Sequence, residues 1–308
     1  MVSLQHRFPF PLEEDRYLYS NNLKPLDPPC CIQVTTEYFD EVAEKRRLLE
    51  AHPERCFHAL PGTLAAQWEV VDAVVHQLVE NYPDCFTIEK RDDEWTFRNL
   101  LLNETDRFTF GDASTLPVQP LDWIGRHVQE DLLIMVQRDD DIYLEAGQLC
   151  FPSVWSLTFD LGMAFQEIHR PVPWSNELAE KIRRFLLRVE AGKPWTRLNW
   201  TLQVGRRLHI PPETFDEWGT ARYQVTLENV ADEVQFRVEE QCVLRLPGSN
   251  ALLFSIHTYL KSVGELCDRP DWAHKLYSVL VTLPEQVVTY KGLAAYREQV
   301  IDYLGRCL

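Results

Sequence analysis

Polar side chains recur at every second position in two stretches that have the character of β-strands. In VQFRVEEQCVLRLP (234–247), one face would carry Gln235, Arg237, Glu239, Gln241 and Arg245. In RLNWTLQV (197–204), one face would carry Arg197, Asn199, Thr201 and Gln203. Successive side chains of a strand point to opposite faces of a sheet, so each row is predicted to lie on a single face.

These two rows have a chemical use if both strands belong to one sheet and turn their polar faces toward a common cavity. A guanidinium, a carboxylate and an amide that converge on a small space can polarise a bound molecule. The carboxylate of Glu239 could also hold a small cation or accept a proton. The alternative is that water bathes both rows, which would then be an ordinary solvated surface.

A third candidate group is the imidazole of His169, in the stretch QEIHRPVP (166–173). The preceding run, SLTFDLGMAF, has helical spacing of apolar residues and predicts a helix that ends near the histidine. Pro171 and Pro173 disfavour helix in the residue before each of them, which gives a rigid exit that would fix the direction of the imidazole. His169 is then either a structural residue or a ligand of a metal or haem iron. His257, on a strand, and His274, on a helix, are weaker candidates.

The order of helical and strand patterns predicts an α+β fold. Helices are expected over 36–52, 60–83, 175–192 and 270–308, in addition to the run that carries His169. Hairpins are expected over 85–101 and 131–153, and further strands over 197–204, 234–247 and 251–263. Antiparallel hairpins around a helical insert favour α+β over a doubly wound sheet. Residues 1–35 are proline-rich and are expected to wrap the surface.

Composition and motif searches exclude several classes of function. The net charge of −16 disfavours nucleic acid and anionic membrane surfaces as partners. The sequence has no GxGxxG or GxxxxGK[ST] phosphate loop, no GxSxG and no HExxH. No signal peptide or membrane-spanning run is recognisable. The eight cysteines form no CxxC pair, so we expect reduced cysteines in a cytoplasmic protein.

Several short motifs occur in an order and spacing that resemble a known family. They are SLTFDLGMAFQEIHRPVP, TRLNWTL, FRVEEQCVLRLP, FSIHTYL and YKGL. Together they resemble the α subunit of the haem-dependent oxidative N-demethylases, from RYLYSNNLKPLDP near the N-terminus to YKGL. The resemblance implies a PAS-like antiparallel sheet with flanking helices, and with helical N- and C-terminal extensions, that closes over haem b. It also implies oxidative demethylation of a small secondary amine such as dimethylamine, with O2 and electrons from NADPH.

The resemblance also implies partners and site residues. A flavin and iron–sulfur reductase would supply electrons, and flavin mononucleotide, the iron–sulfur cluster and tetrahydrofolate are expected only on partner subunits. His169 matches the proximal haem ligand. Arg197 and Glu239 match the polar residues around the O2 and amine site, and Lys193 matches a basic position there. Asn199, Arg237 and Arg245 are assigned to the cofactor, where the two arginines would hold the haem propionates or Glu239 itself.

The sequence departs from the family pattern at two places. Glu239 is followed by Glu240 and Gln241 where many relatives have arginine and glutamine, and Asp160 stands where a basic residue is expected. We expect one structural unit made of an N-terminal extension (1–83), a haem-binding core (84–265) and C-terminal helices (266–308). A haem-binding PAS-like gas or redox sensor is the alternative to an enzyme, and a scaffold without cofactor is a further one.

Overall fold

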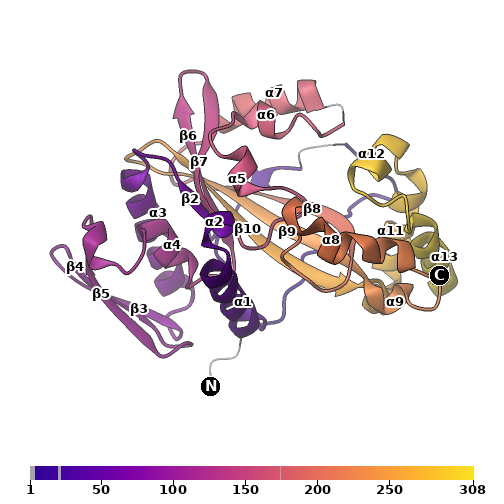
Figure 1. Ribbon diagram of the computed structural model, residues 1–308, viewed down its shortest axis with the longest axis horizontal. Coiled ribbons are helices and arrows are strands. Elements are labelled where there is room, and N and C mark those ends of the chain that lie inside the picture. The colour runs from indigo at the N-terminus through magenta and orange to yellow at the C-terminus, as the bar shows by residue number, and fades with distance from the viewer. Residues whose placement is uncertain (1–3, 20–21, 174) are drawn as a thin grey trace.

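The computed structural model of the protein describes residues 4–19, 22–173 and 175–308 (Figure 1). Helices pack around a large antiparallel sheet, so the predicted α+β class is confirmed. Figure 1 shows α5 to α7 above the sheet, α1 to α4 at one end and the C-terminal helices at the other end. No helix in the described ranges is long and apolar enough to cross a membrane.

The main sheet has seven strands in the order β1–β8–β9–β10–β6–β7–β2. Its strands are β1 (Lys24–Pro25), β2 (Phe57–Ala59), β6 (Asp131–Arg138), β7 (Asp141–Gln148), β8 (Trp195–Val204), β9 (Val234–Arg245) and β10 (Leu252–Ser262). All the pairings between neighbours are antiparallel. The five long strands lie where alternation of side-chain type predicted them, because one or both of their faces are buried. The short edge strands β1 and β2 come from the first 83 residues.

A second, three-stranded sheet lies at one end of the molecule. It consists of β3 (Phe86–Arg91), β4 (Glu94–Asn99) and β5 (Glu104–Thr109). The first two strands confirm the predicted hairpin, whereas β5 was not predicted. Trp68 of α3 (Leu64–Asn81) packs on Phe108 of β5, with ring centroids 5.9 Å apart. Together with α1 (Tyr38–Ala51) and α4 (Pro120–Gly125), α3 covers one face of β6 and β7.

The prediction of one continuous helix before His169 is wrong. The chain instead forms two single turns, α5 (Leu157–Asp160) and α6 (Phe165–Ile168), followed by α7 (Ser175–Leu186). Between the two turns, Gly162 has a φ of +83°, a left-handed conformation that a continuous helix cannot contain. The Gly162 N–H donates to the Leu144 carbonyl at 2.6 Å, so the break docks on β7. These three helices cover the face of β6 and β7 opposite to the face that α1, α3 and α4 cover.

The C-terminal helices cover the other face of β8 and β9. They are α10 (Val263–Cys267), α11 (Pro270–Thr282), α12 (Glu285–Tyr290) and α13 (Arg297–Cys307). Shorter helices are α2 (Pro53–Cys56), α8 (Phe215–Trp218) and α9 (Val230–Glu233), with 3-10 turns at 113–115, 212–214 and 219–224. Cys267 and Cys307 form a disulfide with Cα atoms 5.9 Å apart. The expectation that all the cysteines are reduced is therefore wrong for this pair.

The N-terminal segment packs on the same side as the C-terminal helices. Phe10 stacks on Trp272 of α11 with ring centroids 4.7 Å apart. The Arg7 guanidinium lies 2.6 Å from Glu240 Oε1, and the Tyr259 hydroxyl donates to Glu240 Oε2 at 3.0 Å. Glu240 is therefore bound on the face of β9 that Glu239 does not share, as strand parity predicts.

Candidate functional site

A cavity of about 340 Å³ lies against the face of the main sheet that α5, α6 and α7 cover. Its apolar part comes mainly from β6, β7, β10, α6 and α7, and includes Leu133, Met135, Leu144, Ile182, Leu186 and Phe254. Its polar part comes mainly from β8, β9 and the end of α12, and includes Arg197, Asn199, Thr201, Glu239, Gln241 and Lys291. Cofactor and small-molecule sites commonly combine a largely apolar lining with a few placed polar groups.

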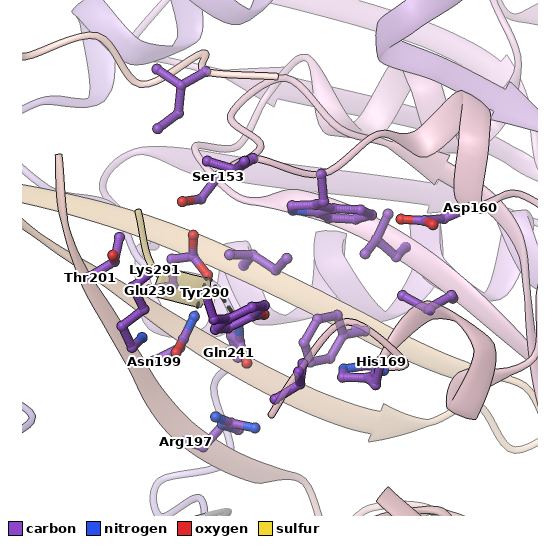
Figure 2. A pocket seen from close by; sticks show the side chains of 18 of the residues that line it. Ser153, Asp160, His169, Arg197, Asn199, Thr201, Glu239, Gln241, Tyr290 and Lys291 are labelled. Carbon is purple, nitrogen blue, oxygen red and sulfur yellow. Dashed lines mark hydrogen bonds between the residues drawn. The ribbon is translucent and has the colours of Figure 1, made fainter. Parts of the chain in front are cut away.

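The polar wall follows from the pairing of β8 with β9. Asn199 lies opposite Glu239, and Arg197 lies opposite Gln241, in an antiparallel register. Residues that are directly opposite in two paired strands share a face, so all four side chains point to the same side. The prediction that the two polar rows face one cavity is confirmed for Arg197, Asn199, Thr201, Gln203, Glu239 and Gln241 but not for Gln235, Arg237 and Arg245. Figure 2 shows Arg197, Asn199, Glu239 and Gln241 at the cavity.

The carboxylate of Glu239 is held by three donors. Arg237 Nε lies 3.1 Å from Oε1, and the side-chain amides of Asn199 and Gln241 donate to Oε2 at 3.2 and 3.1 Å. The Glu239 side chain is 8% exposed. Hydrogen bonds and an opposite charge are what a buried carboxylate requires, and they fix its orientation in the cavity wall.

Arg237 holds Glu239 and does not line the cavity. Its side chain is fully buried, and its remaining N–H groups lie 3.0 to 3.2 Å from Gln203 Oε1, Leu208 O and Thr258 Oγ1 and 2.5 Å from Phe151 O. A guanidinium has five N–H donors, and all five have acceptors here. Of the two roles predicted for Arg237, the structure thus supports contact with Glu239, and leaves it no donor for a cofactor carboxylate.

Arg245 and Lys193 both lie outside the cavity, so their assignment to the site is corrected. Arg245 is buried, and it donates to the carbonyls of Leu186, Val189 and Asn250 and to the side chain of Gln137 at 2.6 to 3.0 Å. It therefore anchors the end of α7 to the sheet. The Lys193 side chain is 69% exposed and pairs with Glu190 across a surface turn. The alternation of side chains that suggested Arg245, and the closeness of Lys193 to a family motif, could not reveal the partners of either residue.

His169 lines the apolar part of the same cavity, directly after the single turn of α6. Its Nδ1 lies 2.8 Å from the Phe165 carbonyl oxygen, and the Phe165 ring stacks on the imidazole at 4.1 Å. A carbonyl can only accept, so Nδ1 carries the proton and the lone pair of the neutral ring is on Nε2. Burial lowers the pKa of His169, and the positive charge of Arg197 lowers it further. The ring is thus kept in the neutral form that ligates metals.

Arg197 contributes an unsatisfied positive charge to the polar wall. Its Nε is buried and has no hydrogen-bond partner among the described residues. Burial lowers the pKa of Arg197, whereas the nearby carboxylate of Glu239 opposes that effect. An arginine stays protonated in proteins even so, and its buried charge favours a negatively charged ligand group.

Tyr290 and Lys291 reach the cavity from the end of α12, although neither was predicted as a site residue. Lys291 Nζ donates to the Trp200 carbonyl at 2.5 Å and lies 4.8 Å from the centroid of the Trp200 ring. Burial lowers the pKa of Lys291 to about 8, with Glu239 opposing and Arg197 adding to this shift. Both residues belong to the motif YKGL. This motif contributed to the family resemblance, but nothing in it predicted that its residues line the cavity.

Asp160, at the end of α5, also lines the cavity and is buried. Burial raises the pKa of Asp160 to about 6, and the negative charge of Glu213 raises it further. In Figure 2, Asp160 and His169 lie on one side of the cavity and the group around Glu239 lies on the other. The position that departs from the family pattern therefore faces the cavity as an acid.

The two weaker histidine candidates lie elsewhere. His257 Nδ1 is 2.7 Å from Glu130 Oε1 in a fully buried pair, and its register partner on β9 is Glu240 rather than Glu239. The attraction of Glu130 outweighs the effect of burial, so the pKa of His257 is raised. His274 is 55% exposed beside Asp15. Within the described part of the chain, no three His, Cys, Asp or Glu side chains gather as a metal site of their own.

The sequence was compared with models of known protein families. A model described as haem-dependent oxidative N-demethylase, alpha subunit-like, matches residues 22–301. The match spans all the strands of the main sheet and every residue named above as lining the cavity.

Proposed function

Because this chain belongs to the haem-dependent oxidative N-demethylase, alpha subunit-like, family, we propose that it binds haem b in this cavity and demethylates a small secondary amine. The reaction consumes one O2, two electrons and two protons for each methyl group removed. It yields the shortened amine, formaldehyde and water. The observation that carries this proposal is the placement of His169 and the polar wall around one apolar cavity.

The residues present fit a haem. His169 offers a lone pair on Nε2 because its Nδ1 proton is bound to the Phe165 carbonyl. One imidazole suffices, since the porphyrin supplies the other iron ligands. Apolar side chains of β6, β7 and α7 provide surface for a flat macrocycle, and the buried Nε of Arg197 is an unused donor in the same cavity.

Haem, when bound, supplies the iron redox chemistry and the activation of O2. The chain contributes the groups that bind and orient the other reactants. Glu239, fixed by Asn199, Gln241 and Arg237, presents Oε1 to accept a hydrogen bond from the N–H of the amine. Arg197 offers buried positive charge to negative charge that develops beside it.

Lys291 is the residue of the polar wall best suited to hold and release a proton. Its pKa of about 8 makes the protonated and neutral forms of Nζ comparable near physiological pH. The demethylation consumes protons, and Nζ is at the cavity wall. We propose that Lys291 delivers a proton from Nζ, with its position set by the Trp200 carbonyl.

The proposal extends to architecture and partners. A PAS-like core is supported by five contiguous antiparallel strands, β8–β9–β10–β6–β7, with α5 to α7 inserted between β7 and β8 over the cavity. The family description as an alpha subunit supports electron supply by a separate subunit, for which a flavin and iron–sulfur reductase is the proposed donor. Tetrahydrofolate on a partner would take up formaldehyde.

Haem binding is tested with the full chain and its visible spectrum. We expect wild-type protein supplied with haem to show a Soret band at one haem per chain. His169→Ala should shift that band and weaken haem binding at least tenfold, whereas His274→Ala, an exposed control, should do neither. A wild-type preparation without a Soret band would end the proposal.

Catalysis is tested by O2 uptake and formaldehyde release with a supplied reductant. We expect secondary amines to accelerate both, and Glu239→Gln to reduce the amine-dependent rate by about tenfold or more, because it removes a charge-assisted hydrogen bond. If the haem is reduced and binds O2 but no secondary amine speeds turnover, the protein is a haem-based sensor instead.

A further inference from the structure

The polar wall of the cavity has more positive charge than its carboxylate can balance. Glu239 is already ion-paired with Arg237, and its Oε2 accepts from both Asn199 and Gln241. A carboxylate has about four lone-pair positions, and three of those on Glu239 are occupied by the protein. The remaining position, on Oε1, can serve one ligand N–H but cannot also neutralise a second cation.

Arg197 is a cation of this wall that has no counterion among the described residues. It makes no ion pair with any described residue, and its buried Nε has no acceptor. Glu239 acts on Arg197 only as a nearby charge, not as a salt-bridge partner. A buried N–H without an acceptor is costly, whereas a ligand carboxylate can accept two N–H groups of one guanidinium side by side.

Lys291 does not fill this role equally well. Its Nζ is already bound to the Trp200 carbonyl, and its pKa of about 8 means that it is partly neutral in mildly alkaline solution. Arg197 keeps its charge at all such pH values, and the planar fork of a guanidinium matches the shape of a carboxylate.

The spacing along the strands suits a ligand with both charges. Asn199 faces Glu239 and Arg197 faces Gln241, so Arg197 and Glu239 are diagonal neighbours on the shared face. Diagonal neighbours in an antiparallel pair are about 7–8 Å apart, and their Cβ atoms are somewhat closer. This leaves room between the two side chains for a small molecule that has an amine next to a carboxylate.

From these contacts we propose that Arg197 binds a carboxylate group in the cavity. The carboxylate belongs either to a substrate of the N-methyl amino acid class, whose amine then meets Glu239, or to a propionate of the cofactor. Both assignments rest on the proposed function. The two sources share one chemistry and are separated by two arms of the same experiment.

The amine arm uses full-length protein without added haem. Thermal shifts are recorded with sarcosine, with sarcosine amide, which lacks the carboxylate, and with dimethylamine. If a substrate carboxylate is the partner, wild-type protein should bind sarcosine at least tenfold more tightly than the other two, since the charge-assisted contact is lost with them. Arg197→Met should abolish this preference.

The cofactor arm titrates the same proteins with haem and with haem dimethyl ester, followed by the Soret band. If a propionate is the partner, wild-type protein should bind the ester at least tenfold more weakly than haem. Arg197→Met should bind both forms alike. Arg184→Met is the matched control in both arms. Arg184 is 66% exposed, so this substitution removes the same charge at a site outside the cavity.

The outcomes are distinct. A carboxylate preference in either arm that Arg197→Met removes supports the inference and identifies the source. No carboxylate preference in either arm for wild-type protein overturns it, a result that does not depend on whether the variant folds. If no haem form binds, the proposed function fails, but the amine arm still decides the inference.

Discussion

Buried charged side chains in this protein fall into two groups according to their partners. Arg237 and Arg245 have their guanidinium groups surrounded by acceptors from distant segments and act as structural anchors. Asp160, which is buried, and Arg197, which is half-buried with a buried Nε, line the cavity without an ion-pair partner among the described residues. An unpaired buried charge lowers stability. When such a charge lies in a cavity wall, a ligand can supply the missing partner, so we expect ligand contacts at these residues.

Asp160→Asn should make stability less dependent on pH. The pKa of Asp160 is about 6 in the folded chain and near 3.8 when unfolded, so the folded state holds a proton between these values that the unfolded state releases. Wild-type stability therefore falls as pH rises through this window. Above pH 6, Asn avoids the buried charge and should raise the free energy of unfolding by about 1–2 kcal/mol.

Urea denaturation at pH 4 and pH 8 measures this difference. The gain should be present at pH 8 and small at pH 4, where the carboxyl is protonated in the folded wild-type protein and roughly half ionised in the unfolded chain. Asp302→Asn, an exposed change on α13, provides the control. Equal stability of Asp160→Asn and wild-type protein at pH 8 would show that the Asp160 carboxylate is adequately solvated.

At the scale of elements, the cavity depends on a break in helical structure. A continuous helix through SLTFDLGMAFQEI would carry the chain past the sheet, whereas the left-handed Gly162 turns it back so that α6 delivers His169 to the cavity. The hydrogen bonds of Gly162 and Met163 with Leu144 fix this turn on β7.

Gly162→Ala should weaken haem binding, and Gly111→Ala should not. Both glycines have positive φ, and an added Cβ at either site would meet no atom closer than ordinary contact. Each substitution should therefore cost about 1 kcal/mol from backbone conformation alone. Gly162 lies in the turn directly before α6 and His169, whereas Gly111 lies far from both in the sequence, so only the Gly162 variant should lose haem affinity.

Chemical denaturation and haem titration of both variants separate these effects. Similar stability losses with a selective loss of haem affinity in Gly162→Ala would support the role of the break. Equal haem affinity in the two variants would mean that the left-handed turn at Gly162 is not needed to position α6.

At the scale of the molecule, the cavity is completed by the C-terminal part of the chain. Tyr290 and Lys291 are at the end of α12, which lies between α11 and α13 in the sequence. The disulfide joins the end of α10 to the end of α13, with a sequence separation of 40. This link encloses the whole segment that supplies the two residues to the cavity wall.

Cys307→Ser should lower stability by about 2–4 kcal/mol, because removing the link increases the freedom of the unfolded chain. Thermal unfolding with and without a thiol reductant measures it. Reductant should lower the melting temperature of wild-type protein and leave that of the variant unchanged. Eight free thiols in unreduced native protein, one for each cysteine of the sequence, would contradict the disulfide.

The strands of the site were predictable, because alternation fixes which side chains share a face. It placed Arg197, Asn199 and Glu239 together before any pairing was known. The roles of Arg237 and Arg245 were not predictable, since they depend on carbonyls from segments 50 or more residues away. Side-chain alternation along the strand assigned both arginines to the polar face. It could not show whether either arginine had N–H groups free to bind a ligand.

Other features were hidden for different reasons. A lone glycine such as Gly162 is tolerated within helices, so the periodic run gave no decisive sign of a break. Strand β5 is short and half polar, and its alternation is weak. Lys291 comes to the cavity only through the packing of the C-terminal helices, which local pattern does not describe.

Adjacent residues on β9 serve opposite sides of the sheet. Glu239 faces the cavity, and Glu240 binds Arg7 of the N-terminal segment and Tyr259. An insertion or deletion of one residue in this strand would exchange the two sides at once, placing Arg237 and Glu239 among the aliphatic residues of the other layer. A point substitution in β9 therefore changes one side of the sheet, whereas a change in its length would disrupt both.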